Sequence, residues 1–128
     1  QHPFADGALR PAMVNDPRWH GFGRVVRPLE RVILSTMAAD GAVCQQRLLS
    51  VLMPGDAIPD HVDRQAPLWW GRIHMPLATN SASRFLVSGI AYHLRVGSAY
   101  VVNTERPHAV MNPGPSPRVH LMLDIGRG

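Results

Sequence analysis

From Gln46 to Ile125 the chain consists of short β-type runs, and this pattern constrains the fold more than any other feature of the sequence. Residues of turn-forming type, such as Pro54-Gly55-Asp56 and Val96-Gly97-Ser98, separate the runs. No helical period lies between them. The eight runs span residues 46–53, 57–63, 68–79, 84–89, 91–95, 99–103, 108–112 and 118–125. They predict an all-β fold of the double-stranded β-helix type, also called a jelly roll.

The N-terminal part has a different composition. Residues 1–24 are rich in Pro, Gly and Asp without sustained periodicity, which predicts an irregular arm packed through Phe4, Trp19 and Phe22. Residues 28–39 open with a proline and carry spaced apolar residues, which predicts one short amphipathic helix. With 128 residues, 45% of them hydrophobic, we expect one domain, in which residues 1–43 form an arm and helix and residues 44–128 form the core.

Composition excludes several classes of function. Cys44 is the only cysteine, so the chain has no internal disulfide and no cysteine-rich zinc cluster. All 13 basic residues are arginine, which excludes a lysine Schiff base and a Walker-type phosphate loop. The net charge of +4 is dispersed, so we expect no nucleic-acid partner. No apolar stretch of membrane-spanning length and no signal segment is present, and we expect a cytoplasmic protein. A start at Gln1 is compatible with removal of an upstream segment.

A candidate metal site combines the second and seventh β-type runs. In a strand, residues two apart point to the same face, so His61 and Asp63 project together, and His108 opens the seventh run. A histidine in a strand is more often a hydrogen-bonded structural residue, and the His-x-Asp triplet alone is weak. However, two imidazoles and one carboxylate form the facial triad of non-haem iron(II) oxygenases, which leaves positions for a chelating cosubstrate and O2. We therefore expect His61, Asp63 and His108 to bind Fe(II).

Arginine and histidine side chains strengthen this expectation. Arg118 opens the eighth run and shares a face with His120, Met122 and Asp124, while Arg72 and His74 share a face of the third run. An isolated arginine is usually a surface residue, but a polar face beside the His108 run is better explained as the lining of a site. Because the planar guanidinium binds carboxylates through two hydrogen bonds, we expect Arg118, Arg72 and His74 to bind an anion near the metal.

Three stretches, RLLSVLMPGDAIPDHVD, GRIHMPLATN and RPHAVMNPGPSPRVHLMLDI, resemble the aspartyl/asparaginyl β-hydroxylase family of Fe(II)/2-oxoglutarate-dependent oxygenases, whose jelly roll is shared with cupins. The resemblance implies that His61 and His108 bind iron and that 2-oxoglutarate is held by Ser50, Arg72, His74 and Arg118. Because it has Asp63, the chain resembles the bacterial free-proline cis-hydroxylases more than the animal peptide hydroxylases. This resemblance implies hydroxylation of an unactivated C–H bond in a free amino acid or derivative, with 2-oxoglutarate and O2 converted to succinate and CO2.

Alternative functions remain open at this stage. They are hydroxylation of Asp or Asn residues in peptides and a non-catalytic cupin-like module that binds a metal or a small acid. A different cupin enzyme is disfavoured because the chain lacks His-x-His. Trp70, Asn80 and Asn112 are candidates for contact with a small-molecule substrate, with Trp69 and Arg84 as weaker ones, although tryptophans in strands are usually core residues and Asn80 suits a turn. A homodimer is compatible with a chain this short.

Overall fold

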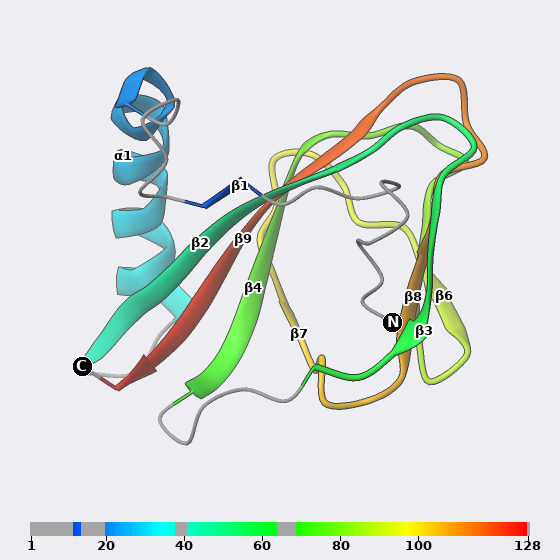
Figure 1. The fold of residues 1–128 in the computed structure, drawn as a ribbon. Helices are drawn as coiled ribbons and strands as arrows, with labels where there is room; N and C mark the ends of the chain where they lie inside the picture. The colour runs from blue at the N-terminus through cyan, green and yellow to red at the C-terminus, as the bar shows by residue number, and fades with distance from the viewer. Residues whose placement is uncertain (1–11, 14–19, 38–40, 64–68, 128) are drawn as a thin grey trace.

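The computed structural model describes residues 12–13, 20–37, 41–63 and 69–127, and these residues form one helix and nine strands (Figure 1). Eight of the strands, β2 to β9, coincide with the eight predicted runs, so the predicted fold class is confirmed. The elements are β1 (Ala12–Met13), α1 (His20–Met37), β2 (Ala42–Leu52), β3 (Ala57–His61), β4 (Trp69–Ala78), β5 (Arg84–Val87), β6 (Ile90–Tyr92), β7 (Tyr100–Val102), β8 (His108–Met111) and β9 (Arg118–Arg127).

The strands form two antiparallel sheets. The larger sheet has the order β1-β2-β9-β4-β7, and the smaller sheet has the order β3-β8-β5-β6. Along the chain, consecutive strands mostly alternate between the two sheets, which is the connectivity of a double-stranded β-helix. The side chains between the sheets form one apolar cluster, which consists of Leu52, Ile58, Phe85, Val102 and Val110.

Helix α1 determines which face of the larger sheet points into the barrel. Val26 and Ile33 of α1 belong to one apolar cluster with Leu121, Leu123 and Ile125 of β9. The helix therefore covers the outer face of this sheet, on the side away from the smaller sheet (Figure 1). Because side chains alternate along a strand, the other face of β9 and β4, with its arginines and histidines, points toward the smaller sheet. The packing of α1 against Leu121, Leu123 and Ile125 thus shows which face of β9 points into the barrel, a question that the alternating pattern left open.

The helix is longer than the sequence predicted. It runs from His20 to Met37 with Pro28 inside it, whereas the sequence predicted a start at the proline and an irregular arm through residue 24. Those two expectations were wrong for residues 20–27, and the irregular arm was also wrong for Ala12–Met13, which form β1 and pair with β2. Val26 is only 2% exposed, so packing of this turn on the sheet favours a helix despite the missing proline N–H. The expected contacts of Phe4, Trp19 and Phe22 lie outside what the structure describes.

An ion pair joins the helix to the sheet. The Arg47 guanidinium on β2 donates two hydrogen bonds to the carboxylate of Glu30 on α1, which is largely buried. Among the described residues, no helix combines the length and the apolar character that crossing a membrane requires.

Candidate metal centre and anion-binding cluster

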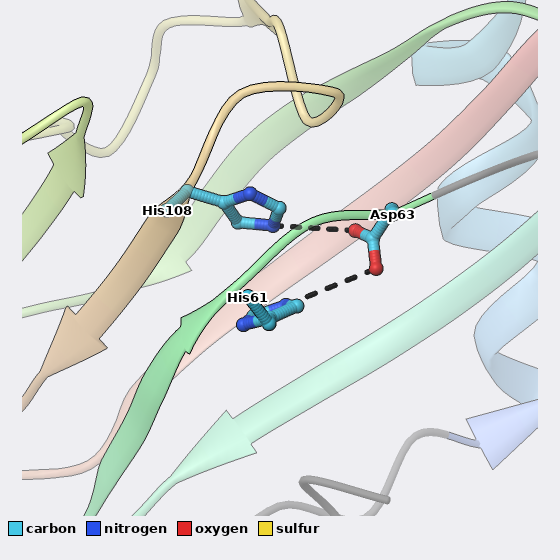
Figure 2. Close-up of side chains that lie close together, drawn as sticks. All are labelled: His61, Asp63 and His108. Atoms are coloured by element: carbon cyan, nitrogen blue, oxygen red, sulfur yellow. Dashed lines mark ion pairs between the residues drawn. The ribbon is translucent and has the colours of Figure 1, made fainter.

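Three potential metal ligands meet at one end of the barrel. His61 ends β3 and His108 begins β8, and the two residues are direct partners in the antiparallel pair, with ring centroids 4.2 Å apart. Asp63 follows two residues after His61, and its backbone N–H donates to the Thr104 carbonyl at 2.8 Å. One ligand atom from each of His61, Asp63 and His108 lies within 4.8 Å of the others, and Figure 2 shows the three side chains turned toward one another.

Backbone carbonyls define which nitrogen of each imidazole faces this cluster. Nδ1 of His61 lies 2.7 Å from the Pro59 carbonyl oxygen, and Nδ1 of His108 lies 2.9 Å from the Arg106 carbonyl oxygen. Since a carbonyl only accepts, both Nδ1 atoms donate, and a neutral ring then carries a lone pair on Nε2. Nε2 of His108 is 3.2 Å and Nε2 of His61 is 3.8 Å from the Asp63 carboxylate. Three electron-pair donors thus converge, which suits a bound cation.

Asp63 is kept in its charged form. Burial alone would raise the pKa of this carboxyl, but the neighbouring His108 and the positive charge of Arg72 outweigh it and lower the pKa. An ionised carboxylate is the form that binds a metal.

A second cluster, which we call the anion cluster, consists of Ser50, His74, Arg118 and His120 inside the barrel. Arg118 is only 2% exposed and donates to Ser50 Oγ at 3.2 Å and to His120 Nδ1 at 2.8 Å. Burial lowers the pKa of Arg118 to about 9, and no acidic side chain of the described residues forms an ion pair with it. A buried cation with only neutral partners is costly, so the cluster favours an incoming anion.

His74 completes the cluster and carries an unused ring nitrogen. Its Nδ1 lies 3.1 Å from His120 Nδ1, while its buried Nε2 has no hydrogen-bond partner. Burial, together with the nearby His120 and Arg118, holds the pKa of His74 well below its usual value. An orphaned buried polar atom next to an uncompensated charge is the arrangement expected where a ligand is bound.

The two clusters are connected through one aromatic ring. Phe85 of β5 packs edge-on against His74, with ring centroids 5.1 Å apart, and stacks on His108 at 6.1 Å with an interplanar angle of 3°. Phe85 therefore contacts one residue of each cluster.

Arg72 does not lie with the anion cluster as the sequence predicted. Its guanidinium donates to both carboxylate oxygens of Asp124, at 2.7 and 3.0 Å, and to Asp63 Oδ2 at 3.1 Å. Burial alone would lower the pKa of Arg72, but the hydrogen bonds and charges of these two carboxylates raise it. The Arg72 guanidinium thus bonds to two carboxylates, whereas Arg118 bonds to Ser50 and His120, and His74 lies against His120.

Asn80 and Asn112, predicted to face a substrate, are engaged elsewhere. The Asn80 amide donates to Asn112 Oδ1 at 2.9 Å and to the Ser116 carbonyl at 2.8 Å, and its own oxygen accepts from Ala82 and Ser83 backbone N–H groups. Asn112 is fully buried and donates to the Leu52 carbonyl at 2.9 Å. These bonds tie loops together at the barrel end away from His108, which gives both amides a structural role.

The remaining candidates contribute little to the site. Trp70 is 44% exposed on β4, and Arg84 donates to the carbonyls of Ser81 and Ser83. The side chain of Trp69 lies outside what the structure describes. Burial raises the pKa of the Cys44 thiol to about 11, in agreement with the interpretation of this residue as an unreactive small side chain.

The fold and the two clusters define a jelly-roll protein with a candidate His-Asp-His metal centre, and comparison of the sequence with known families gives a closer assignment. The profile of the aspartyl/asparaginyl β-hydroxylase family matches residues 21–128. This chain therefore belongs to the aspartyl/asparaginyl β-hydroxylase family. No functionally curated protein is detectably similar to it in sequence.

Solved structures support the fold. A 2-oxoglutarate–Fe(II) oxygenase-family oxidoreductase from Burkholderia pseudomallei is similar with a TM-score of 0.69 and 15% identity, over 94% of this chain and 66% of that one. Viral collagen prolyl hydroxylase from Paramecium bursaria Chlorella virus-1 gives a TM-score of 0.65 and 12% identity, over 94% of this chain and 80% of that one. A Cupin_2 domain from an Enterobacter cloacae transcriptional regulator gives 0.54 and 14%, over 94% and 98%. At these identities the likeness concerns the fold.

Proposed function

We propose that the chain is an Fe(II)/2-oxoglutarate-dependent dioxygenase that hydroxylates an unactivated C–H bond of a small substrate, a free amino acid or a derivative of one. The observation that carries the proposal is the pairing of two complementary sites inside one barrel. His61, Asp63 and His108 offer three ligands to a cation, and Arg118 offers a buried, uncompensated positive charge to an anion. A cosubstrate that chelates a metal at one end and carries a carboxylate at the other needs both.

The donor set fits iron(II). Two imidazole nitrogens and one carboxylate oxygen are the ligands of the facial triad, and Asp63 supplies the anionic member of the set. The hydrogen bonds from both Nδ1 atoms to backbone carbonyls fix the ring orientations in advance. Iron held here would couple oxidative decarboxylation of 2-oxoglutarate, with O2, to hydroxylation of the substrate.

The protein's own residues bind and orient the cosubstrate. In this proposal Arg118 and Ser50 receive the carboxylate of 2-oxoglutarate that lies far from the metal, and the charge of that carboxylate offsets the cost of burying the guanidinium. The carboxylate would also raise the pKa of His74, so that Nε2 takes up a proton and donates to it. Phe85, whose ring contacts His74 and stacks on His108, would form part of the wall along which the cosubstrate reaches from this end to the metal.

A cavity beside the metal cluster suits the small substrate. It measures about 320 Å3 between β5, β6 and β7, at the low end of the volumes of ligand sites. Phe85 in its wall stacks on His108, and Val87 is the cross-strand partner of His108. The described wall is apolar except for Asn103 and the two tyrosine hydroxyls, and it consists of Phe85, Val87, Tyr92, Leu94, Tyr100, Val101, Val102 and Asn103. This lining favours the apolar side chain or ring of a substrate. A cytoplasmic location and a homodimer stay predictions.

Succinate release tests the proposal. Purified protein is incubated with Fe(II), ascorbate and 2-oxoglutarate, with and without a panel of free amino acids, their derivatives and short Asp- or Asn-containing peptides. We expect succinate to form in stoichiometric amounts with a hydroxylated product for one small substrate, and only at background level for His108→Ala. If succinate never exceeds the His108→Ala background, the chain is a binding module. Coupling to a peptide alone would move it to the peptide hydroxylases.

A further inference from the structure

Arg72 stands between two carboxylates, one of which belongs to the candidate metal centre. It is the direct cross-strand partner of Asp124 in the β4–β9 pair, and its Nε and one terminal nitrogen reach the two oxygens of Asp124 at 2.7 and 3.0 Å. The other terminal nitrogen reaches Asp63 Oδ2 at 3.1 Å. The same Oδ2 atom is 3.2 Å from Nε2 of His108. The guanidinium thus bonds to Asp124 of β9 through one edge and to the candidate metal ligand Asp63 through its other terminal nitrogen.

The two carboxylates that Arg72 contacts differ in burial. The side chains of Arg72 and Asp124 are 11% and 4% exposed, whereas that of Asp63 is 23% exposed and lies beyond the end of β3. A bidentate pair on two adjacent strands fixes the plane of a guanidinium better than a single contact does. The rigid partner is therefore the Arg72–Asp124 pair, and the side chain that needs orientation is Asp63.

Charge explains why two acids accompany one arginine. An arginine beside Asp63 alone would neutralise the carboxylate that a metal needs, and its positive charge would repel the metal. With Asp124 included, the group of three carries a net charge of −1, the same as one carboxylate ligand. Asp124 therefore allows Arg72 to hold Asp63 without cancelling its charge.

We propose that Arg72 is a positioning residue that orients Asp63 for metal binding, with Asp124 as its counterion, and that it does not bind the cosubstrate. The inference rests on the proposed function, because it assumes that Asp63 is a ligand. The two arginines then have different roles. Arg118, which has no acidic partner among the described residues, binds the anion. Arg72 already pairs with two carboxylates, and these would repel the carboxylate of a cosubstrate.

Two binding measurements on full-length protein separate these roles. Co(II) affinity is measured from the visible absorption of the bound ion, and metal-free binding of 2-oxoglutarate is measured by calorimetry. We expect Arg72→Gln to weaken Co(II) binding by about ten- to hundredfold and to leave metal-free 2-oxoglutarate binding within about twofold. The matched control, Arg118→Gln, should show the reverse. Asp124→Asn should weaken Co(II) binding in the same direction, and the double variant Arg72→Gln/Asp124→Asn should be no weaker than Arg72→Gln.

Further variants keep the test decisive if Arg72→Gln fails to fold. Arg72→Lys retains the charge without the fork, so it should restore only part of the Co(II) affinity and should shift the Co(II) spectrum. Unchanged Co(II) binding in Arg72→Lys and Asp124→Asn, or a loss of metal-free 2-oxoglutarate binding in Arg72→Gln as large as in Arg118→Gln, would overturn the inference. Asp63→Asn tests the proposed function separately: if it leaves Co(II) affinity intact, the metal site itself is wrong, whatever Arg72 does.

Discussion

Replacement of Arg118 by methionine should make the ligand-free protein more stable while it abolishes cosubstrate binding. The fall of the Arg118 pKa from the ordinary value of a guanidinium to about 9 corresponds to about 5 kcal/mol of cost for holding the charge in the folded protein. Methionine fills much of the same space without charge, but it forfeits the hydrogen bonds to Ser50 and His120, which contribute about 1 to 1.5 kcal/mol each. The balance is a gain of about 2 kcal/mol.

Thermal and urea unfolding of the metal-free protein measure this balance. For a chain of this length the gain should appear as a rise in Tm of about 5 to 10 °C for Arg118→Met. Addition of 2-oxoglutarate at a hundredfold excess over its Kd should stabilise the wild type by about 2.7 kcal/mol and leave the variant unchanged. The exposed Arg95→Met is the control and should stay within about 0.5 kcal/mol of the wild type.

Loss of stability would refute the reasoning. If Arg118→Met lowers the free energy of unfolding by more than about 1 kcal/mol without ligand, the guanidinium is a structural element with sufficient partners of its own. The same conclusion would follow if 2-oxoglutarate stabilised wild type and variant equally.

Three further predictions concern the rest of the molecule. Burial keeps His74 and His120 neutral, the latter with a pKa of about 2 against 6.5 in the unfolded chain, so only the unfolded state takes up their protons below about pH 6.5. The free energy of unfolding should therefore fall by up to about 1.4 kcal/mol per pH unit for each histidine as the pH drops below 6.5, and urea titrations of His120→Gln should show a shallower fall; an identical slope would count against it. Glu30→Gln removes the ion pair with Arg47 under α1 and should cost about 1 to 3 kcal/mol in urea unfolding, whereas a change below about 0.3 kcal/mol would show that the helix is held by apolar packing alone. A Cβ on Gly114 would overlap the Asn80 side-chain oxygen, which four hydrogen bonds of that amide hold in place, so Gly114→Ala should cost about 1 to 3 kcal/mol, and unchanged stability would mean that Asn80 moves freely.

Strands β2 to β9 could be predicted from the sequence because each is a run of β-type residues bounded by turn residues. His61 and Asp63 could be paired because residues two apart in extended chain lie on one face, although β3 itself ends at His61. The N-terminal boundary of α1 could not be predicted, because burial of Val26 on the sheet outweighs the local preference that Pro28 expresses. Such packing is a property of the folded chain and leaves no local signal.

The pairing of strands distant in sequence explains why Arg72 contacts two carboxylates, which the sequence did not predict. The alternation of β9 placed Asp124 on the face of Arg118, and that of β4 placed Arg72 beside His74. Only the pairing of β4 with β9 reveals that Arg72 opposes Asp124 and therefore faces acids rather than an anion site. A resemblance to a family assigns Arg72 by its position in a motif. Its partners in the folded protein are Asp63, nine residues earlier, and Asp124, 52 residues later. Asn80 and Asn112 likewise meet only in the folded protein.

The claim that this barrel holds Fe(II) and 2-oxoglutarate together is tested most directly by visible absorption. A ferrous ion chelated by 2-oxoglutarate gives an absorption band in the visible range, and the band requires the metal and the cosubstrate in the same site. Under anaerobic titration we predict that wild-type protein with saturating 2-oxoglutarate develops the band up to one equivalent of Fe(II). His61→Ala and His108→Ala should develop none, and Arg118→Met should need a much higher concentration of 2-oxoglutarate. Absence of the band in the wild type, or a band of equal strength in His108→Ala, would contradict the account.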